Sequence, residues 1–277
     1  MRLGLDVAQH HLSWEEILAR VRYAEETGFD GAWVFDHFQS LYGDPGGPCL
    51  EGWTLLAALA AATERIRLGT LVTGMTHRHP SVLATEAVTV DHVSNGRLEL
   101  AVGAAWNDTE HQQLGIEFPI VAERAERLEE GIEVLRALMT KDHVTYEGKY
   151  YGLANATYQP RPVQRPHPPI WIGASGERLM LPVVARQADV WHTFGTVEEL
   201  RKRARLLDAM IGDAGRPPSA VVRATDLSIS EEWDDVRRRA DGFREAGFTY
   251  LVVEWPTEGK GRLEEFVEKV MPDLEAA

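Results

Sequence analysis

Short apolar runs alternate with longer amphipathic segments along almost the whole chain. The runs rich in β-branched and aromatic residues predict eight strands, at 2–7, 32–36, 66–73, 97–103, 169–174, 189–194, 220–229 and 249–255. The amphipathic segments between and after them predict eight helices, at 14–27, 52–62, 81–93, 122–139, 177–187, 197–211, 231–246 and 261–274. Gly28 and Gly247 each follow a predicted helix, where a left-handed residue commonly ends one.

Eight consecutive strand-helix units predict one α/β domain over residues 1–277. Their strands are too apolar for a half-exposed sheet, which favours a closed (β/α)8 TIM barrel over a doubly wound sheet. Only the stretch at about 143–168 breaks the alternation, with a possible hairpin at 144–151 and four prolines after it. We interpret this stretch as a short insertion after the fourth helix, of the kind that often has a functional role on a barrel.

The charge balance excludes several classes of partner. The chain has 29 Lys and Arg against 43 Asp and Glu, a formal charge of −14, which argues against binding to nucleic acids and anionic membranes. Cys49 is the single cysteine, so the chain forms neither an internal disulfide nor a cysteine zinc cluster. The chain begins as a strand rather than a signal peptide, and it has no apolar run of transmembrane length. We therefore expect a cytoplasmic protein that acts on a small molecule.

In a (β/α)8 barrel the reactive groups lie at the C-terminal ends of the strands. That rule selects the following candidates: Asp6, His10, His11, Asp36, His37, 73–79, 106–108, 173–176, His192, Thr193, Asp226 and Glu254. Among them, the small residues Ala174, Ser175 and Gly176 lead from a strand into a helix. Their backbone N–H groups suit a phosphate, although a tightly packed turn needs the same small residues. The sequence contains no ATP-binding motif and no convincing nicotinamide-binding motif.

The histidines raise the alternative of a metal-dependent barrel hydrolase. His77-Arg78-His79 has the spacing of a metal-binding pair, and further ligands could come from His10, His37, His192 and Glu254. The pair lies in a turn beyond a strand, however, where strand alternation does not place both imidazoles on one side. We therefore predict no metal site and keep the hydrolase as a distant alternative.

Four segments carry a resemblance to a known family. They are 26–38 (ETGFDGAWVFDHF), 67–80 (RLGTLVTGMTHRHP), 94–107 (SNGRLELAVGAAWN) and 169–177 (PIWIGASGE). In this order and spacing they resemble the bacterial luciferase-like superfamily of flavin- and deazaflavin-dependent oxidoreductases, which are (β/α)8 barrels. Asp36-His37-Phe38 and Thr73-Gly74-Met75 most resemble the branch that uses coenzyme F420.

The resemblance implies hydride transfer between the deazaflavin and a small organic substrate, with His37 as the candidate catalytic acid or base. It implies a non-prolyl cis peptide against the deazaflavin ring, which we place at Gly74-Met75. The remaining cofactor contacts that it implies are with Asp36, Thr73 and Asn107 along the ring and ribityl chain, and with Ala174, Ser175 and Gly176 at the phosphate.

The resemblance leaves the cofactor and the substrate open. The alternative within the superfamily is a monooxygenase that uses reduced FMN. The sugar-phosphate dehydrogenases of the F420 branch carry a glutamate in the loop after the fourth strand, where this chain has Ala104-Ala105-Trp106, so that substrate is not implied. Because dimers are common in the family, we expect a possible homodimer.

Overall fold

Parallel strands form a closed ring in the computed structural model, which describes residues 1–44 and 46–276. The ring contains β1 (Arg2–Asp6), β2 (Gly31–Val34), β3 (Arg67–Thr70) with its continuation β4 (Thr73–Gly74), β5 (Leu98–Gly103), β8 (Ile170–Gly173), β9 (Val190–His192), β10 (Val222–Leu227) and β11 (Tyr250–Val253). The pairing of β3 with β5 closes the ring. The (β/α)8 barrel predicted from the sequence is confirmed.

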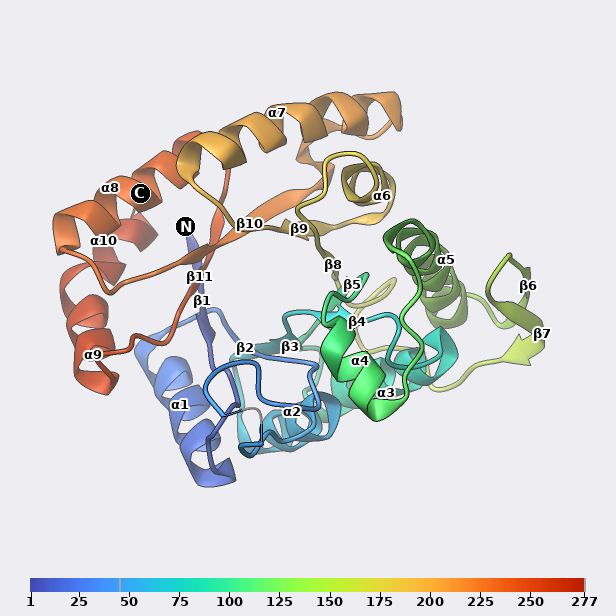
Figure 1. Ribbon diagram of the computed structural model, residues 1–277, viewed down its shortest axis with the longest axis horizontal. Helices are drawn as coiled ribbons and strands as arrows, with labels where there is room; N and C mark the ends of the chain where they lie inside the picture. Colours follow the sequence, from blue (N-terminus) through green and yellow to red (C-terminus); the bar gives the residue numbers. More distant parts are fainter. Residues whose placement is uncertain (45, 277) are drawn as a thin grey trace.

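Helices surround the ring and cover the outer faces of the strands, except that α4 lies at the end where the strands finish (Figure 1). They are α1 (Trp14–Thr27), α2 (Gly52–Ala62), α3 (Pro80–Val93), α4 (Asp108–Leu114), α5 (Val121–Thr140), α6 (Met180–Gln187), α7 (Val197–Asp213), α8 (Trp233–Glu245), α9 (Lys260–Lys269) and α10 (Met271–Ala276), with a 3-10 turn, η1 (Pro218–Ala220). Gly28 ends α1 in the left-handed conformation, as its position predicted.

Apart from shifts of one or two residues at helix ends, the helices differ from the sequence prediction in three ways. The short helix α4 was not predicted. Helix α6 begins at Met180 rather than at residue 177, because the N–H groups of Met180 and Leu181 both donate to the Gly176 carbonyl and close a turn first. The last predicted helix is divided into α9 and α10, since Pro272 removes an N–H group and cannot continue the helix from α9.

Aromatic side chains fill the interior of the barrel. Trp33 and Trp171 lie with their ring centroids 4.5 Å apart, and Tyr250 meets Trp171 edge-on at 4.9 Å. Two glycines make room for them, because a Cβ on Gly4 would lie 2.6 Å from the Trp33 ring nitrogen and one on Gly69 would lie 2.5 Å from its six-membered ring. The barrel centre is therefore a packed core, and any ligand has to bind at one of its ends.

The insertion after α5 forms an antiparallel hairpin, β6 (His143–Glu147) and β7 (Gly152–Thr157), which projects beside α5 (Figure 1). A hairpin was predicted at 144–151, and its second strand lies further along the chain than predicted. Glu130 of α5 accepts hydrogen bonds from the backbone N–H groups of Lys149 and Tyr150 at 2.9 Å each, which fixes the hairpin turn on the helix.

The chain ends lie together, because the amino group of Met1 donates to the carbonyl of Leu274 at 2.8 Å. Within the described residues, no helix is both long and apolar enough to cross a membrane.

Candidate active site

The third barrel strand is interrupted at the C-terminal mouth, the end of the barrel at which the strands finish. The interruption carries a non-prolyl cis peptide at Leu71-Val72, so the prediction of a cis bond at Gly74-Met75 was wrong. Glycines on two other barrel strands make room for the Val72 side chain beside it. A Cβ on Gly103 or on Gly173 would lie 2.7 or 2.8 Å from the Val72 side chain, so Val72 packs against both. Gly74 instead belongs to β4 and pairs with Gly103.

A buried carboxylate holds the candidate acid or base in place. Glu110 of α4 is fully buried, and its Oε2 lies 2.8 Å from His37 Nδ1, while its Oε1 accepts from the N–H groups of Phe38 and Gln39. Burial raises the pKa of Glu110, but the hydrogen bonds from His37 and the two amides outweigh it, so the pKa lies below its ordinary value. Glu110 is therefore ionised, His37 Nδ1 carries the proton it donates, and His37 Nε2 is left to meet a ligand.

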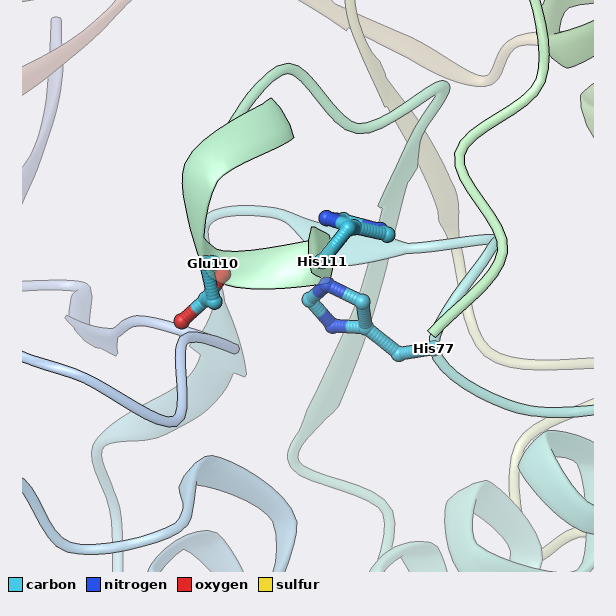
Figure 2. Close-up of side chains that lie close together, drawn as sticks. All are labelled: His77, Glu110 and His111. Carbon is cyan, nitrogen blue, oxygen red and sulfur yellow. The ribbon is translucent and has the colours of Figure 1, made fainter. Parts of the chain in front are cut away.

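His111, the neighbour of Glu110, lies beside His77 in the same cluster (Figure 2). His111 Nδ1 lies 2.7 Å from the Asn107 carbonyl, which can only accept, so Nδ1 carries the proton and Nε2 accepts from the Thr76 hydroxyl at 2.7 Å. Burial is the main cause of a lowered pKa at His111, which keeps the ring neutral.

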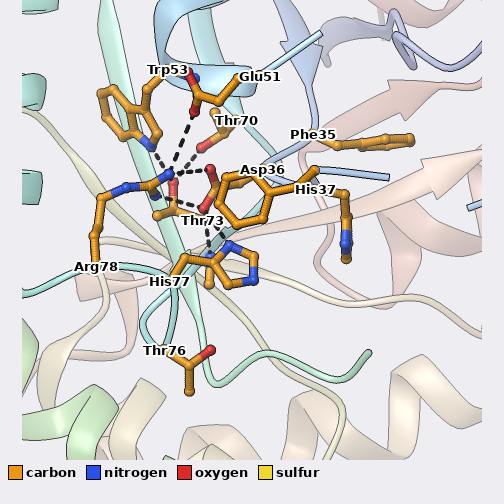
Figure 3. Close-up of polar contacts among 12 residues, drawn as sticks. Phe35, Asp36, His37, Glu51, Trp53, Thr70, Thr73, Thr76, His77 and Arg78 are labelled. Carbon is orange, nitrogen blue, oxygen red and sulfur yellow. Dashed lines mark hydrogen bonds and ion pairs between the residues drawn. The ribbon is translucent and has the colours of Figure 1, made fainter. Parts of the chain in front are cut away.

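Asp36 ties the end of β2 to the loop after β4 (Figure 3). Its two oxygens accept from both terminal nitrogens of Arg78, at 2.7 and 2.8 Å, and Oδ2 also accepts from Gly74 N–H and His77 Nδ1 at 3.1 Å each. Burial raises the pKa of Asp36, but the bonds from His77 and Arg78 lower it more, so the carboxyl stays ionised. The Asp36 carboxylate therefore fixes the loop that follows the interrupted strand.

Three other predicted cofactor residues have their side chains engaged within the protein. The Thr73 hydroxyl lies 2.6 Å from that of Thr70 and accepts from the Trp53 indole at 3.1 Å. Met75 is buried against α5, where a Cβ on Gly131 would lie 2.6 Å from its sulfur. The Asn107 side chain caps α4 by accepting from Glu110 N–H at 3.2 Å. Contacts of Thr73 and Met75 with a ligand would therefore have to use the backbone.

The predicted phosphate segment lies at the same mouth, after β8. Ala174 N–H donates to the His192 carbonyl, but Ser175 and Gly176 are exposed, and their N–H groups donate to no backbone carbonyl of the described chain. A Cβ on Gly176 would meet only Met180, at 3.5 Å. Ser175 and Gly176 thus offer two free amide donors in open space, which fits an anionic group.

A second group of titratable side chains occupies the other side of the mouth. His192 Nε2 lies 2.8 Å from Asp226 Oδ1. The carboxyl groups of Asp6 and Glu254 lie close enough to Asp226 for its charge to raise the pKa of each. Burial, followed by the repulsion of Asp226 and Glu254, raises the pKa of Asp6 to about 8. A ligand at the mouth would therefore meet carboxyl groups on this side.

The structure separates the two histidines of His77-Arg78-His79. His79 caps α3, with Nδ1 accepting from Ser81 N–H at 3.1 Å, and it lies against Tyr151. His77 turns inward to Asp36. The spacing that suggested a metal-binding pair therefore does not bring these two rings to one ligand.

Sequence reasoning missed Glu110, although it brought Asp36 and His37 forward. A signal was present, since Asn107 followed three residues later by Glu110 has the spacing of a helix N-terminus with a capping residue. Placing a helix there would have put Glu110 and His111 on an element next to the candidate site.

The sequence matches the luciferase-like monooxygenase family over residues 1–269. The chain therefore belongs to this family. An F420-dependent glucose-6-phosphate dehydrogenase of Microbacterium testaceum is 39% identical over 236 residues, 83% of this chain and 68% of the relative. An uncharacterized protein of Mycobacterium tuberculosis is 30% identical over 271 residues, 92% of this chain and 93% of the relative.

Among solved structures, an F420-dependent secondary alcohol dehydrogenase in complex with an F420-acetone adduct superposes with a TM-score of 0.88. The superposition covers 98% of each chain at 20% sequence identity. This likeness agrees with the closed barrel described above.

Proposed function

We propose that this protein is a coenzyme F420-dependent oxidoreductase that transfers a hydride between the deazaflavin and a small organic substrate. The observation that carries the proposal is the pair formed by His37 and the buried, ionised Glu110 at the barrel mouth. The relatives named as F420-dependent dehydrogenases support the choice of cofactor.

The residues present fit the cofactor. The exposed amides of Ser175 and Gly176, with Ala174 beside them, would hold its phosphate. The interrupted strand at Val72 to Gly74 and the residues Asp36, Thr73, Met75 and Asn107 would lie along its ring and ribityl chain. When bound, coenzyme F420 donates or accepts a hydride.

The chain's own contribution to the reaction is to move a proton. His37 Nδ1–H is fixed by Glu110, which sets the ring tautomer and orientation and stabilises the charged ring when Nε2 takes a proton. Nε2 would take a proton from a substrate hydroxyl during oxidation, or return it to a carbonyl oxygen during reduction. Glu110 is accordingly a positioning residue, and His37 is the catalytic one.

The test is to compare His37→Ala and Glu110→Gln with His79→Ala, which changes a histidine outside this pair. With any substrate that bleaches or restores F420 absorbance, His37→Ala should lower kcat by about 100- to 10,000-fold while F420 binding is retained. A variant that combines His37→Ala with Glu110→Gln should lose little more kcat than His37→Ala alone, since Glu110 acts through His37. Full turnover in His37→Ala would refute the assignment.

We also infer a homodimer in the cytoplasm, with a small-molecule substrate and no nucleic-acid or membrane partner. Exposed apolar side chains along α4 and the start of α5 support a protein interface; they are Trp106, Leu114, Ile120 and Val121. Light scattering on the purified protein would test the dimer, since a single chain has a mass of 31.0 kDa.

A further inference from the structure

In the cluster formed by His77, Glu110 and His111, one imidazole nitrogen lacks a hydrogen-bond partner. The His77 side chain is 2% exposed, and its Nε2 is buried without a hydrogen-bond partner anywhere in the described chain. Its other nitrogen, Nδ1, donates to the ionised Asp36, so in the neutral ring Nε2 is the nitrogen that carries the lone pair. A buried acceptor of this kind is uncommon in native proteins and calls for a ligand or a donor.

Two further side chains that can bind a metal ion lie beside His77. His77, Glu110 and His111 each place one ligand atom within 4.8 Å of the others, and Figure 2 shows the three side chains grouped between α4 and the loop after β4. Glu110 and His111 are both fully buried. In Glu110, Oε1 has two amide donors but Oε2 has only His37, so Oε2 retains a lone pair.

Both histidines also have the supporting contacts that metal-binding histidines require. His77 donates its Nδ1–H to the Asp36 carboxylate, and His111 donates its Nδ1–H to the Asn107 carbonyl. Such partners fix the tautomer that presents Nε2 to an ion and raise its basicity. We propose that His77 Nε2, His111 Nε2 and Glu110 form a binding site for a divalent transition-metal ion such as Zn²⁺ or Co²⁺.

Binding would tighten the cluster. Ligands held at about 2.1 Å around a tetrahedral ion lie about 3.4 Å apart, so the side chains have to close on the ion. His111 Nε2 would exchange the Thr76 hydroxyl for the metal. Because Glu110 also holds His37, an ion at this site would couple metal occupancy to the candidate acid or base of the proposed reaction.

Cobalt provides a readout that does not depend on activity. The purified protein, freed of metal by a chelator, is titrated with Co²⁺ while its visible ligand-field absorption is followed, and Zn²⁺ is then added to displace the cobalt. We expect one equivalent of Co²⁺ to bind with a visible band that Zn²⁺ abolishes. Absence of that band at millimolar Co²⁺ would overturn the proposal and leave the cluster as a hydrogen-bonded stack of rings.

Variants separate the site from adventitious binding. His77→Gln should weaken Co²⁺ binding at least tenfold, whereas the exposed His79→Gln should leave it unchanged; equal binding by both variants would refute the site. Thr76→Val keeps every ligand and removes the competing hydroxyl, so it should bind Co²⁺ about two- to tenfold more tightly, the range expected for one neutral hydrogen bond. If His77→Gln does not fold, unchanged or weaker binding by Thr76→Val refutes the site.

Discussion

At the scale of single residues, Asp36 and Arg78 form a bidentate ion pair inside the protein, with side-chain exposures of 0% and 11%. Asp36→Asn would remove the only fully buried carboxylate that pairs with Arg78 among the described residues and leave it the partly exposed Glu51 and Glu86, at 3.5 and 3.3 Å. We expect the free energy of unfolding at pH 7, measured in urea, to fall by about 1.5 to 3 kcal/mol, the range for hydrogen bonds to a charged group. Asp142→Asn is a matched control, because that carboxylate pairs with Arg161 while 86% exposed, and it should change stability by less than about 1 kcal/mol.

The pH dependence of the Asp36 effect has a definite sign. The pKa of this carboxyl is below 3.8 in the folded protein, so its contribution to stability is complete above that value and is lost as the pH falls through the folded pKa. The difference between wild type and Asp36→Asn should therefore shrink in acid. A difference that stays constant down to pH 2 would contradict the ion-pair explanation.

Asp6 should show the opposite behaviour. Its pKa rises from 3.8 to about 8 on folding, so wild-type stability is lost as the pH increases between these values, because the unfolded chain releases the proton first. Asp6→Asn mimics the protonated form, and we expect it to stabilise the protein by about 1 to 3 kcal/mol at pH 9 and by almost nothing at pH 4. Urea unfolding at the two pH values measures this, and an equal effect at both would contradict it.

At the scale of elements, the start of α2 packs directly on the end of β2. A Cβ on Gly52 would lie 2.2 Å from the Phe35 carbonyl oxygen, next to the Asp36-His37 segment. Gly52→Ala should therefore push the helix from the strand and destabilise the protein by about 1 to 3 kcal/mol. In α7, a Cβ on Gly212 meets nothing within 4 Å, so Gly212→Ala should instead stabilise the protein by about 0.5 to 1 kcal/mol. Thermal unfolding of the two variants should show opposite shifts.

The periodic elements could be predicted from the sequence, and the irregular ones could not. The apolar runs of the barrel strands and the stripes of the long helices are properties of single segments. Helix α4 has only seven residues, too few for a periodicity to be evident. The cis peptide lies at Leu71-Val72, where the Val72 side chain packs against Gly103 and Gly173 on strands far along the chain, so the local presence of Gly74 gave the wrong position.

The candidate site shows the same division. Asp36, His37 and Asn107 follow barrel strands, and the barrel rule placed them at the mouth. The roles of Arg78, His77 and Glu110 depend on which partner each side chain reaches, and those partners are separated by 42, 41 and 73 residues. Sequence position alone does not give such contacts.

At the scale of the whole molecule, the barrel places two different groups of side chains at one mouth. The first contains the His37–Glu110 pair and the loop that Asp36 holds, and the second contains the carboxyl groups of Asp6, Asp226 and Glu254. Asp6, with its pKa raised to about 8, is protonated near neutral pH, so repulsion of an anionic substrate group would come from Asp226 and Glu254. The amides of Ser175 and Gly176, in contrast, suit an anion. We therefore expect the cofactor phosphate and the reacting substrate to occupy different sides of the mouth.

A fluorescence titration of the purified protein with coenzyme F420, run in parallel with FMN, determines which of the two cofactors the barrel mouth binds. Our proposal predicts saturable binding of one F420 per chain and much weaker binding of FMN. Tight FMN binding with weak F420 binding would contradict it and favour a monooxygenase that uses reduced FMN, and binding of neither would contradict the proposed cofactor altogether.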